Sequence, residues 1–200
     1  MEIINFTNID DSDPYKIFLD YFNEAKQLNQ ENINAIVISS FNKSMNEVDS
    51  RFVNLKEIKN NNWIFYTNYL SKKAEDFITN DQISVVIFWS KINVQIRMKA
   101  HIKKIDNAYS DKYFKTRDIK KNALAICSNQ SKIVDSYEDI VDSYRETLSR
   151  IDCSIRPDFW GGYAFTPYYF EFWEGHKSRV NKREVFAIND NVWEHLYLQP

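Results

Sequence analysis

The sequence has few residues that break regular secondary structure, form disulfides or bind metal ions. Its 200 residues include three Gly, four Pro, two Cys and three His. The two Cys form no C-x-x-C spacing, and the three His form no H-x-x-x-H or H-x-H pair of metal ligands. We therefore expect reduced thiols and no metal site.

The sequence also lacks a long apolar run and an excess of positive charge. No apolar run is longer than about five residues, as in VVIFW at 85–89, whereas a membrane-spanning helix needs roughly 20 apolar residues. Residues 1–20 carry acids and amides where a secretory signal has a basic start and an apolar centre. The formal net charge of -2 argues against broad affinity for nucleic acid or membranes. We expect a soluble, cytoplasmic protein with neither partner.

Aromatic and apolar residues are abundant, at 16% and 44% of the chain. This content suits a sheet-rich core in a domain of ordinary size. No repeat, low-complexity tract or Gly/Ser linker divides the sequence. We therefore expect a single domain over 1–200, with 1–12 as an N-terminal arm that need not be ordered.

The periodicity of apolar residues predicts strands in the first half of the chain. Asp13 and Pro14 indicate the start of an amphipathic helix, with Asp13 as its cap. A second, short helix is predicted over 71–79. VVIFW is apolar throughout, which predicts a central strand covered on both faces. Five strands are predicted between 33 and 105, within INAIVISSF, SRFVNLKEI, NWIFYTN, ISVVIFW and NVQIRMKAHIKKI.

Helical spacing replaces the strand pattern between 106 and 150, where Asp106 and Ser136 are candidate caps. In the helix after Ser136 we expect Ile140, Val141, Tyr144 and Leu148 to face inward. Strands return after 157, with a hairpin turn at 189–191. The order favours a mainly β fold with α-helices, a partly closed barrel of antiparallel strands decorated by helices. A sandwich is the rival architecture.

Three short stretches combine cations with hydroxyls or amides. RFVNLK places Arg51 and Lys56 on opposite faces of a strand, and TNYLSKK surrounds a predicted helix start with Thr, Ser and two Lys. Such a helix start can bind a phosphate, although a Lys pair there is also typical of a plain solvated surface. GHKSRVNKR, at 175–183, gathers four fixed cations between two strand-like segments.

Taken in order, these stretches resemble the pyridoxamine 5'-phosphate oxidase family, which folds as a split β-barrel that binds flavin mononucleotide (FMN). The resemblance covers nearly the whole chain. It runs through DPYKIFLDYFNEA, RFVNLK, FYTNYLSKK, VQIRMKAHIKKI, SDKYFKTR, SNQS, WGGY, FEFWEG and VWEHLYLQP.

The resemblance implies an FMN site shared between the subunits of a homodimer, with Gln130 and Ser131 reaching the cofactor from the second subunit. The implied FMN-binding residues are Arg51, Phe52, Val53, Lys56, Tyr66, Thr67, Ser71, Lys72, Lys73, Gln95, Gln130, Ser131, Trp173 and Arg183. The implied substrate is a phosphorylated pyridine bound by Lys56, Tyr113, Arg117, Lys121, Arg179 and Asn181, of which Arg179 and Asn181 are the candidate catalytic residues.

The sequence departs from the family pattern at three of these positions. Asn181 stands where the family has a substrate-contacting His, Lys121 where it has a Ser, and Lys72 where it has an Arg. Asn can donate and accept hydrogen bonds but cannot carry a proton charge. The first two changes affect the substrate site more than the flavin site.

Three functions therefore stay open. The first is an FMN-dependent oxidase that converts pyridoxamine or pyridoxine 5'-phosphate to pyridoxal 5'-phosphate, with O2 as acceptor and H2O2 as product. The second is an FMN-dependent oxidoreductase of the same fold acting on another ring substrate. The third is a protein that binds flavin or pyridoxal phosphate without turnover.

Overall fold

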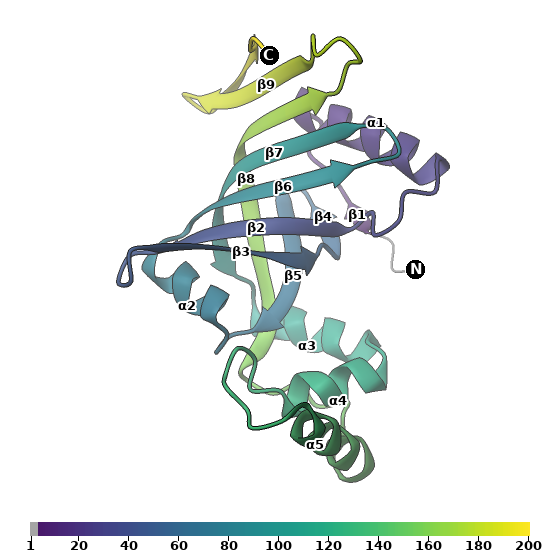
Figure 1. The fold of residues 1–200 in the computed structure, drawn as a ribbon, viewed down its shortest axis with the longest axis vertical. Coiled ribbons are helices and arrows are strands. Elements are labelled where there is room, and N and C mark those ends of the chain that lie inside the picture. The colour runs from purple at the N-terminus through teal and green to yellow at the C-terminus, as the bar shows by residue number, and fades with distance from the viewer. Residues whose placement is uncertain (1–3) are drawn as a thin grey trace.

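The computed structural model describes residues 4–200, in which ten strands and five helices form one curled sheet with helices around it (Figure 1). The helices are α1 (Asp13–Gln27), α2 (Lys72–Thr79), α3 (Asn107–Thr116), α4 (Ile119–Cys127) and α5 (Tyr137–Arg150). The strands are β1 (Asn5–Thr7), β2 (Ala35–Asn42), β3 (Glu47–Asn54), β4 (Glu57–Lys59), β5 (Asn62–Asn68), β6 (Gln82–Trp89), β7 (Val94–Lys104), β8 (Trp160–Glu174), β9 (Lys182–Asn189) and β10 (Val192–Tyr197).

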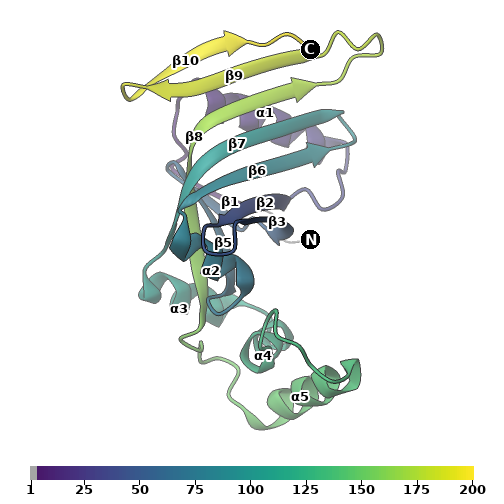
Figure 2. The same ribbon diagram turned by 60° about the vertical axis from the view of Figure 1, so that its left-hand side comes forward.

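The sheet follows the order β1-β4-β5-β8-β7-β6-β2-β3, and β9 and β10 continue from β8. All of its pairs are antiparallel except β1 with β4, which is parallel. The long strand β8 pairs with β5 through its first half and with β9 through its second half. As a result β9 and β10 lie at one end of the molecule and α3 to α5 at the other, in both views (Figures 1 and 2).

The core lies between α1 and the concave face of the sheet and is largely aromatic. Phe18 is fully buried and meets Trp63 edge-on at 4.5 Å, and Tyr15 meets Phe170 at 5.3 Å. Edge-to-face pairs of this kind add to the hydrophobic gain from burial. The helix was expected to have Asp13 as its cap. Its N-cap is Ser12, with Asp13 in the first turn.

Asparagine takes the place of the scarce glycine at left-handed positions of the backbone. Ten non-glycine residues in the described part of the chain have positive φ, and seven of them are Asn. Asn tolerates this conformation better than other residues with a side chain. At the predicted hairpin both Asp190 and Asn191 have positive φ, as a two-residue type I′ turn requires. The predicted turn is therefore confirmed.

Two strand expectations are corrected by the structure. The predicted strand within SRFVNLKEI is interrupted at Leu55 and Lys56, because the backbone changes partner there: β3 pairs with β2, whereas Lys56 N donates to Ile64 O on β5. VVIFW lies centrally, between β7 and β2, but it is not covered on both faces. Phe88 is 53% exposed, because the core covers only one face of β6.

The expectation for the apolar face of α5 is wrong. Ser136 does cap this helix through a capping box with Asp139. However, Ile140 and Leu148 are exposed, and Val141 and Tyr144 are only half-buried. The helix contacts α4 and lies away from the sheet (Figure 2), so it has no concave surface on which to bury that face.

Part of the expected N-terminal arm belongs to the sheet. Residues 5–7 form β1, which pairs with β4, and Ile4 is buried. Residues 1–3 of that arm lie outside the described residues. Within 4–200, no helix is both long and apolar enough to cross a membrane.

Candidate functional site

The first turn of α2 holds a buried lysine. Lys73 is 7% exposed, and its ammonium donates to Thr67 Oγ1 at 3.4 Å and to Ser71 Oγ at 3.3 Å. Among residues 4–200 it forms no ion pair with a carboxylate. A buried cation without a counter-ion, placed at the positive end of a helix, destabilises the fold.

The surroundings of Lys73 also lower the pKa of its ammonium group. Burial, with repulsion from Arg51, lowers the pKa of Lys73 to about 8, although Asp49 and Asp76 oppose this change. A lysine whose pKa the fold lowers toward the neutral range is a candidate for binding an anion, because a bound anion would stabilise its charged form.

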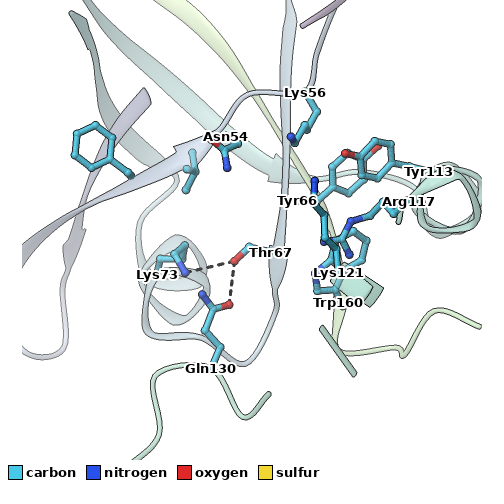
Figure 3. A pocket seen from close by; sticks show the side chains of 12 residues that line it. Asn54, Lys56, Tyr66, Thr67, Lys73, Tyr113, Arg117, Lys121, Gln130 and Trp160 are labelled. Carbon is cyan, nitrogen blue, oxygen red and sulfur yellow. Dashed lines mark hydrogen bonds between the residues drawn. The ribbon is translucent and has the colours of Figure 1, made fainter. Parts of the chain in front are cut away.

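The segment between α4 and α5 brings Gln130 to the same place. Asn68 at the end of β5 donates to Ser128 O at 3.1 Å, which fixes this segment beside α2. Gln130 then lies next to Thr67, with 3.4 Å between Thr67 Oγ1 and Gln130 Oε1. Figure 3 shows Lys73 and Gln130 both directed toward Thr67. Gln130 therefore reaches the pocket of its own chain, whereas the resemblance implied the second subunit.

An aromatic wall forms the opposite side of the pocket. The rings of Tyr66 and Tyr113 stack at 3.8 Å with 7° between their planes, and Trp160 lies parallel to Tyr66 at 5.4 Å. Burial raises the pKa of Tyr66, so its hydroxyl stays protonated. Within the described chain this buried hydroxyl has no hydrogen-bond partner. It is a polar group that a ligand could satisfy.

Cations border this wall. Arg117 lies 4.5 Å from the centre of the Trp160 ring and donates to Asn122 Oδ1 at 3.1 Å, and Asn122 is itself buried. Lys56 and Lys121 lie on the same side of the pocket (Figure 3). Together with Lys73, the described residues of the lining include four cations and no carboxylate.

The structure gathers ten of the predicted site residues around one cavity of about 290 Å³. They are Phe52, Val53, Lys56, Tyr66, Thr67, Lys73, Tyr113, Arg117, Lys121 and Gln130. Small-molecule sites usually measure about 300–1,000 Å³, so the cavity of one chain is at the small end of that range. A larger ligand would extend beyond it.

Arg51, Ser71 and Lys72 lie next to this cavity but do not line it. The Arg51 guanidinium turns away to Asp49 at 2.9 Å and Asp76 at 3.3 Å. Ser71 is the buried N-cap residue of α2, and its hydroxyl donates to Asn68 O. Lys72 is half-exposed, with its ammonium 3.6 Å from the Glu47 carboxylate.

Three other predicted residues form a separate row across the sheet. Gln95 on β7 is the register partner of Trp173 on β8, which is the partner of Arg183 on β9. Directly opposed residues share one face of a sheet, so these side chains are neighbours. Arg183 donates to the buried Glu171 at 2.8 Å. Although burial opposes ionisation, hydrogen bonds from Arg183, Arg97 and Tyr169 hold the pKa of Glu171 below its usual value.

Arg179 and Asn181 occupy the exposed loop between β8 and β9, beyond this row. Asn181 Oδ1 accepts from His176 N at 3.0 Å and so helps to shape the loop. Arg179 has a left-handed backbone, with φ of 61°, as does Ser131, with φ of 71°. Arg179, Asn181 and Ser131 all lie outside the lining of the cavity next to α2, which we call the α2 pocket. A single chain therefore divides the predicted site residues between two places.

Sequence reasoning missed three residues of this region. Asn54 and Trp160 line the pocket, and Asp76 binds Arg51 behind it. Asn54 was recognisable, because it alternates with Phe52 and so shares a face of β3 with it. Nothing in the sequence distinguished Asp76 from the other acidic residues on helix surfaces.

The sequence matches two parts of one family. Residues 23–147 match the family described as pyridoxamine 5'-phosphate oxidase, and residues 160–200 match the pyridoxine 5'-phosphate oxidase C-terminal dimerisation region. A pyridoxine/pyridoxamine 5'-phosphate oxidase of Legionella pneumophila (strain Lens) is 35% identical over 193 residues, which cover 95% of this chain and 89% of the relative.

Solved structures share the fold. PhzG from Burkholderia lata 383, in complex with tetrahydrophenazine-1-carboxylic acid, has a TM-score of 0.87 at 21% identity, covering 94% of this chain and 93% of that one. A pyridoxamine 5'-phosphate oxidase-related, FMN-binding protein from Nostoc punctiforme PCC 73102 has a TM-score of 0.79 at 12% identity, covering 94% and 99%. The fold is thus the expected split barrel, and the chain belongs to the pyridoxamine 5'-phosphate oxidase family of oxidoreductases.

Proposed function

We propose that this protein is an FMN-dependent oxidase of pyridoxamine 5'-phosphate or pyridoxine 5'-phosphate that yields pyridoxal 5'-phosphate. The observation that carries the proposal is Lys73, a buried ammonium whose partners are hydroxyls, at the start of a helix. Such a group costs stability in the free protein and is compensated when a phosphate binds. The matched relatives named as oxidases of these two compounds agree with this reading.

The donors around Lys73 suit the phosphate of FMN. The ammonium, the Thr67 hydroxyl, the Gln130 side chain and the backbone N–H groups of the first turn of α2 are all candidate donors. Phe52 and Val53 would line the path of the remaining nucleotide. When bound, the flavin would supply the redox chemistry, as acceptor of a hydride from the substrate carbon and donor of two electrons to O2, which would leave as H2O2; with the amine substrate, water would hydrolyse the resulting imine and release ammonia.

The other side of the pocket suits the phosphate and ring of the substrate. Lys56, Arg117 and Lys121 supply positive charge, and Tyr113 supplies a hydroxyl, while Tyr66, which stacks on Tyr113, would contact the flavin, as the resemblance implied. Arg117 can present a planar, two-pronged donor set to a phosphate, which Lys cannot. These residues bind and orient the substrate, since the hydride transfer itself needs no protein nucleophile.

A second copy of the chain would complete the site. Gln95, Trp173 and Arg183 form their row at the far end of the sheet, and Arg179 and Asn181 lie in the adjoining loop. A two-fold dimer could bring this end of one subunit to the α2 pocket of the other. The match of residues 160–200 to a dimerisation region supports this arrangement. We propose a cytoplasmic homodimer with FMN at the subunit interface.

A second candidate is an oxidoreductase of the same fold acting on another anionic ring compound. Lys121 favours it, because it adds a fourth cation to the pocket where the family pattern has Ser. The side chain of Asn181, which replaces the family's His, is engaged with His176 N in its own loop. Both differences lie among the residues proposed to meet the substrate.

Turnover in air separates the two candidates. The purified protein, reconstituted with FMN, should release H2O2 and pyridoxal 5'-phosphate in equal amounts when given pyridoxamine or pyridoxine 5'-phosphate. If FMN binds but neither compound yields peroxide, the proposed substrate is wrong and the second candidate stands. If FMN does not bind, both candidates fail.

Affinity for FMN should decrease as the pH rises through about 8. In the free protein Lys73 loses its proton near that pH, and only its charged form attracts the phosphate. The phosphate is already a dianion there, with a second pKa of about 6. Above pH 8 the affinity should therefore fall by up to about tenfold per pH unit. Flavin fluorescence titrations between pH 6.5 and 9.5 would measure the change.

Lys73→Arg provides the control for this pH dependence, because arginine stays charged throughout the range. The variant should lose the decrease that begins near pH 8, whatever its absolute affinity. An equal decrease in both proteins would assign the titration to another group.

A further inference from the structure

A single buried carboxylate joins α2 to the two strands behind it. Asp76 is 1% exposed and lies one helical turn after Lys73. Its carboxylate accepts hydrogen bonds from Ser40 Oγ at 2.6 Å, Asn42 Nδ2 at 2.9 Å and an Arg51 guanidinium nitrogen at 3.3 Å. Ser40 and Asn42 belong to β2 and Arg51 to β3. The position of α2 is therefore defined by contacts with two strands.

The same contacts fix the guanidinium of Arg51. One of its nitrogens donates to Ser40 Oγ at 2.6 Å and to Ile38 O at 3.3 Å, and the other donates to Asp49 and Asp76. Asp49 is half-exposed, so Asp76 is the buried one of the two acids. The carboxylates of Asp49 and Asp76 are thus engaged with Arg51, while among the described residues Lys73 donates only to hydroxyls.

We propose that Asp76 is a positioning residue for the phosphate end of the site: its carboxylate holds Arg51 and the start of α2 in place, so that the Lys73 ammonium is directed to the bound anion. The inference rests on the proposed function, because it takes FMN as the anion. Asp76 itself does not line the cavity. It would act through Arg51 and Lys73.

The charges facing Lys73 make this role measurable. They are Arg51 and Asp49 from β3 and Asp76 from its own helix, while Thr67 on β5 and Gln130 contribute neutral groups. Without the negative charge of Asp76, the positive charge of Arg51 is less compensated. Its repulsion of the Lys73 ammonium then favours loss of the Lys73 proton. A role confined to fold stability would not change the protonation of Lys73 in folded protein.

The test compares Asp76→Asn with Ser40→Ala by FMN titration across pH 6.5–9.5, with thermal melting to confirm folding. Asp76→Asn keeps the shape and loses the charge. It should bind FMN at least about tenfold more weakly at pH 7.5, and the decrease in affinity should begin at a lower pH than in the unmodified protein. Ser40→Ala removes hydrogen bonds but no charge, so it should bind a few-fold more weakly with the decrease at the unmodified pH.

The outcomes are separable. Unchanged FMN affinity in a folded Asp76→Asn protein would overturn the proposal. If that variant does not fold, unchanged affinity in Ser40→Ala would overturn it instead. Failure of the unmodified protein to bind FMN would refute the proposed function rather than the role of Asp76.

Discussion

Lys73→Met should weaken FMN binding by about ten- to a hundredfold, since a charged hydrogen bond is worth about 1.5–3 kcal/mol. Methionine matches the length of the lysine stem without its charge. In the free protein Lys73 is buried at a helix start and forms no ion pair within residues 4–200, so the exchange should not lower the melting temperature and can raise it. Flavin fluorescence titration measures the affinity, and thermal melting without FMN measures the stability.

Lys72→Met is the matched control. The resemblance implied that the adjacent Lys72 also binds FMN, but it is half-exposed, pairs with Glu47 and does not line the cavity, so we propose that it does not hold the phosphate. This variant should bind FMN within about threefold of the unmodified protein, because exposed ion pairs contribute only about 0–1 kcal/mol. Equal losses in both variants would indicate a diffuse effect of positive charge and contradict a specific site at Lys73.

Arg179→Ala should lower kcat by about a hundredfold, the scale at which loss of one electrostatic group acts on an enzymatic rate. FMN affinity should not change, because Arg179 is not among the residues proposed to hold the flavin. Its side chain forms no hydrogen bond or ion pair within residues 4–200, so the fold should tolerate the exchange. Initial rates of peroxide release at saturating substrate, together with FMN titration, give both quantities.

Lys177→Ala, in the same loop, is the control for this variant. Lys177 is exposed and has no proposed role, so both the rate and the FMN affinity should be unchanged. An unaffected rate in Arg179→Ala would remove the loop from the proposed site. Loss of FMN from that variant would contradict the division between flavin-holding and substrate-facing residues.

Much of the fold could be predicted from periodicity, because single strands and helices show which of their faces is buried. β7 alternates as expected, with Val94, Ile96, Met98, Ala100 and Ile102 all buried. The predictions failed where burial depends on the neighbouring element. Phe88 lies on an apolar strand that the core covers on one face, and Ile140 lies on a helix whose main contacts are with α4.

The site could be predicted only in part, for a similar reason. Thr67, near the end of a strand, and Lys73, near the start of the next helix, are close in the sequence. The sequence therefore indicated that their side chains lie near each other. The position of Gln130 depends on the hydrogen bond between Asn68 and Ser128, which joins segments 60 residues apart. The direction of Arg51 depends on Asp76 in another element. Contacts between distant segments of this kind have no periodic signal.

The central claim is that each site is built by two copies of the chain. Mixed dimers test this claim most directly. One subunit carries Lys73→Met and the other Arg179→Ala, and two affinity tags allow the mixed dimer to be isolated. If each site takes Lys73 from one subunit and Arg179 from the other, one site of a two-fold dimer holds both changes and the other holds neither. The mixed dimer should then regain about half of the unmodified activity. Activity no higher than that of the two parent variants would show that both residues serve the same site from one chain, and would contradict the account.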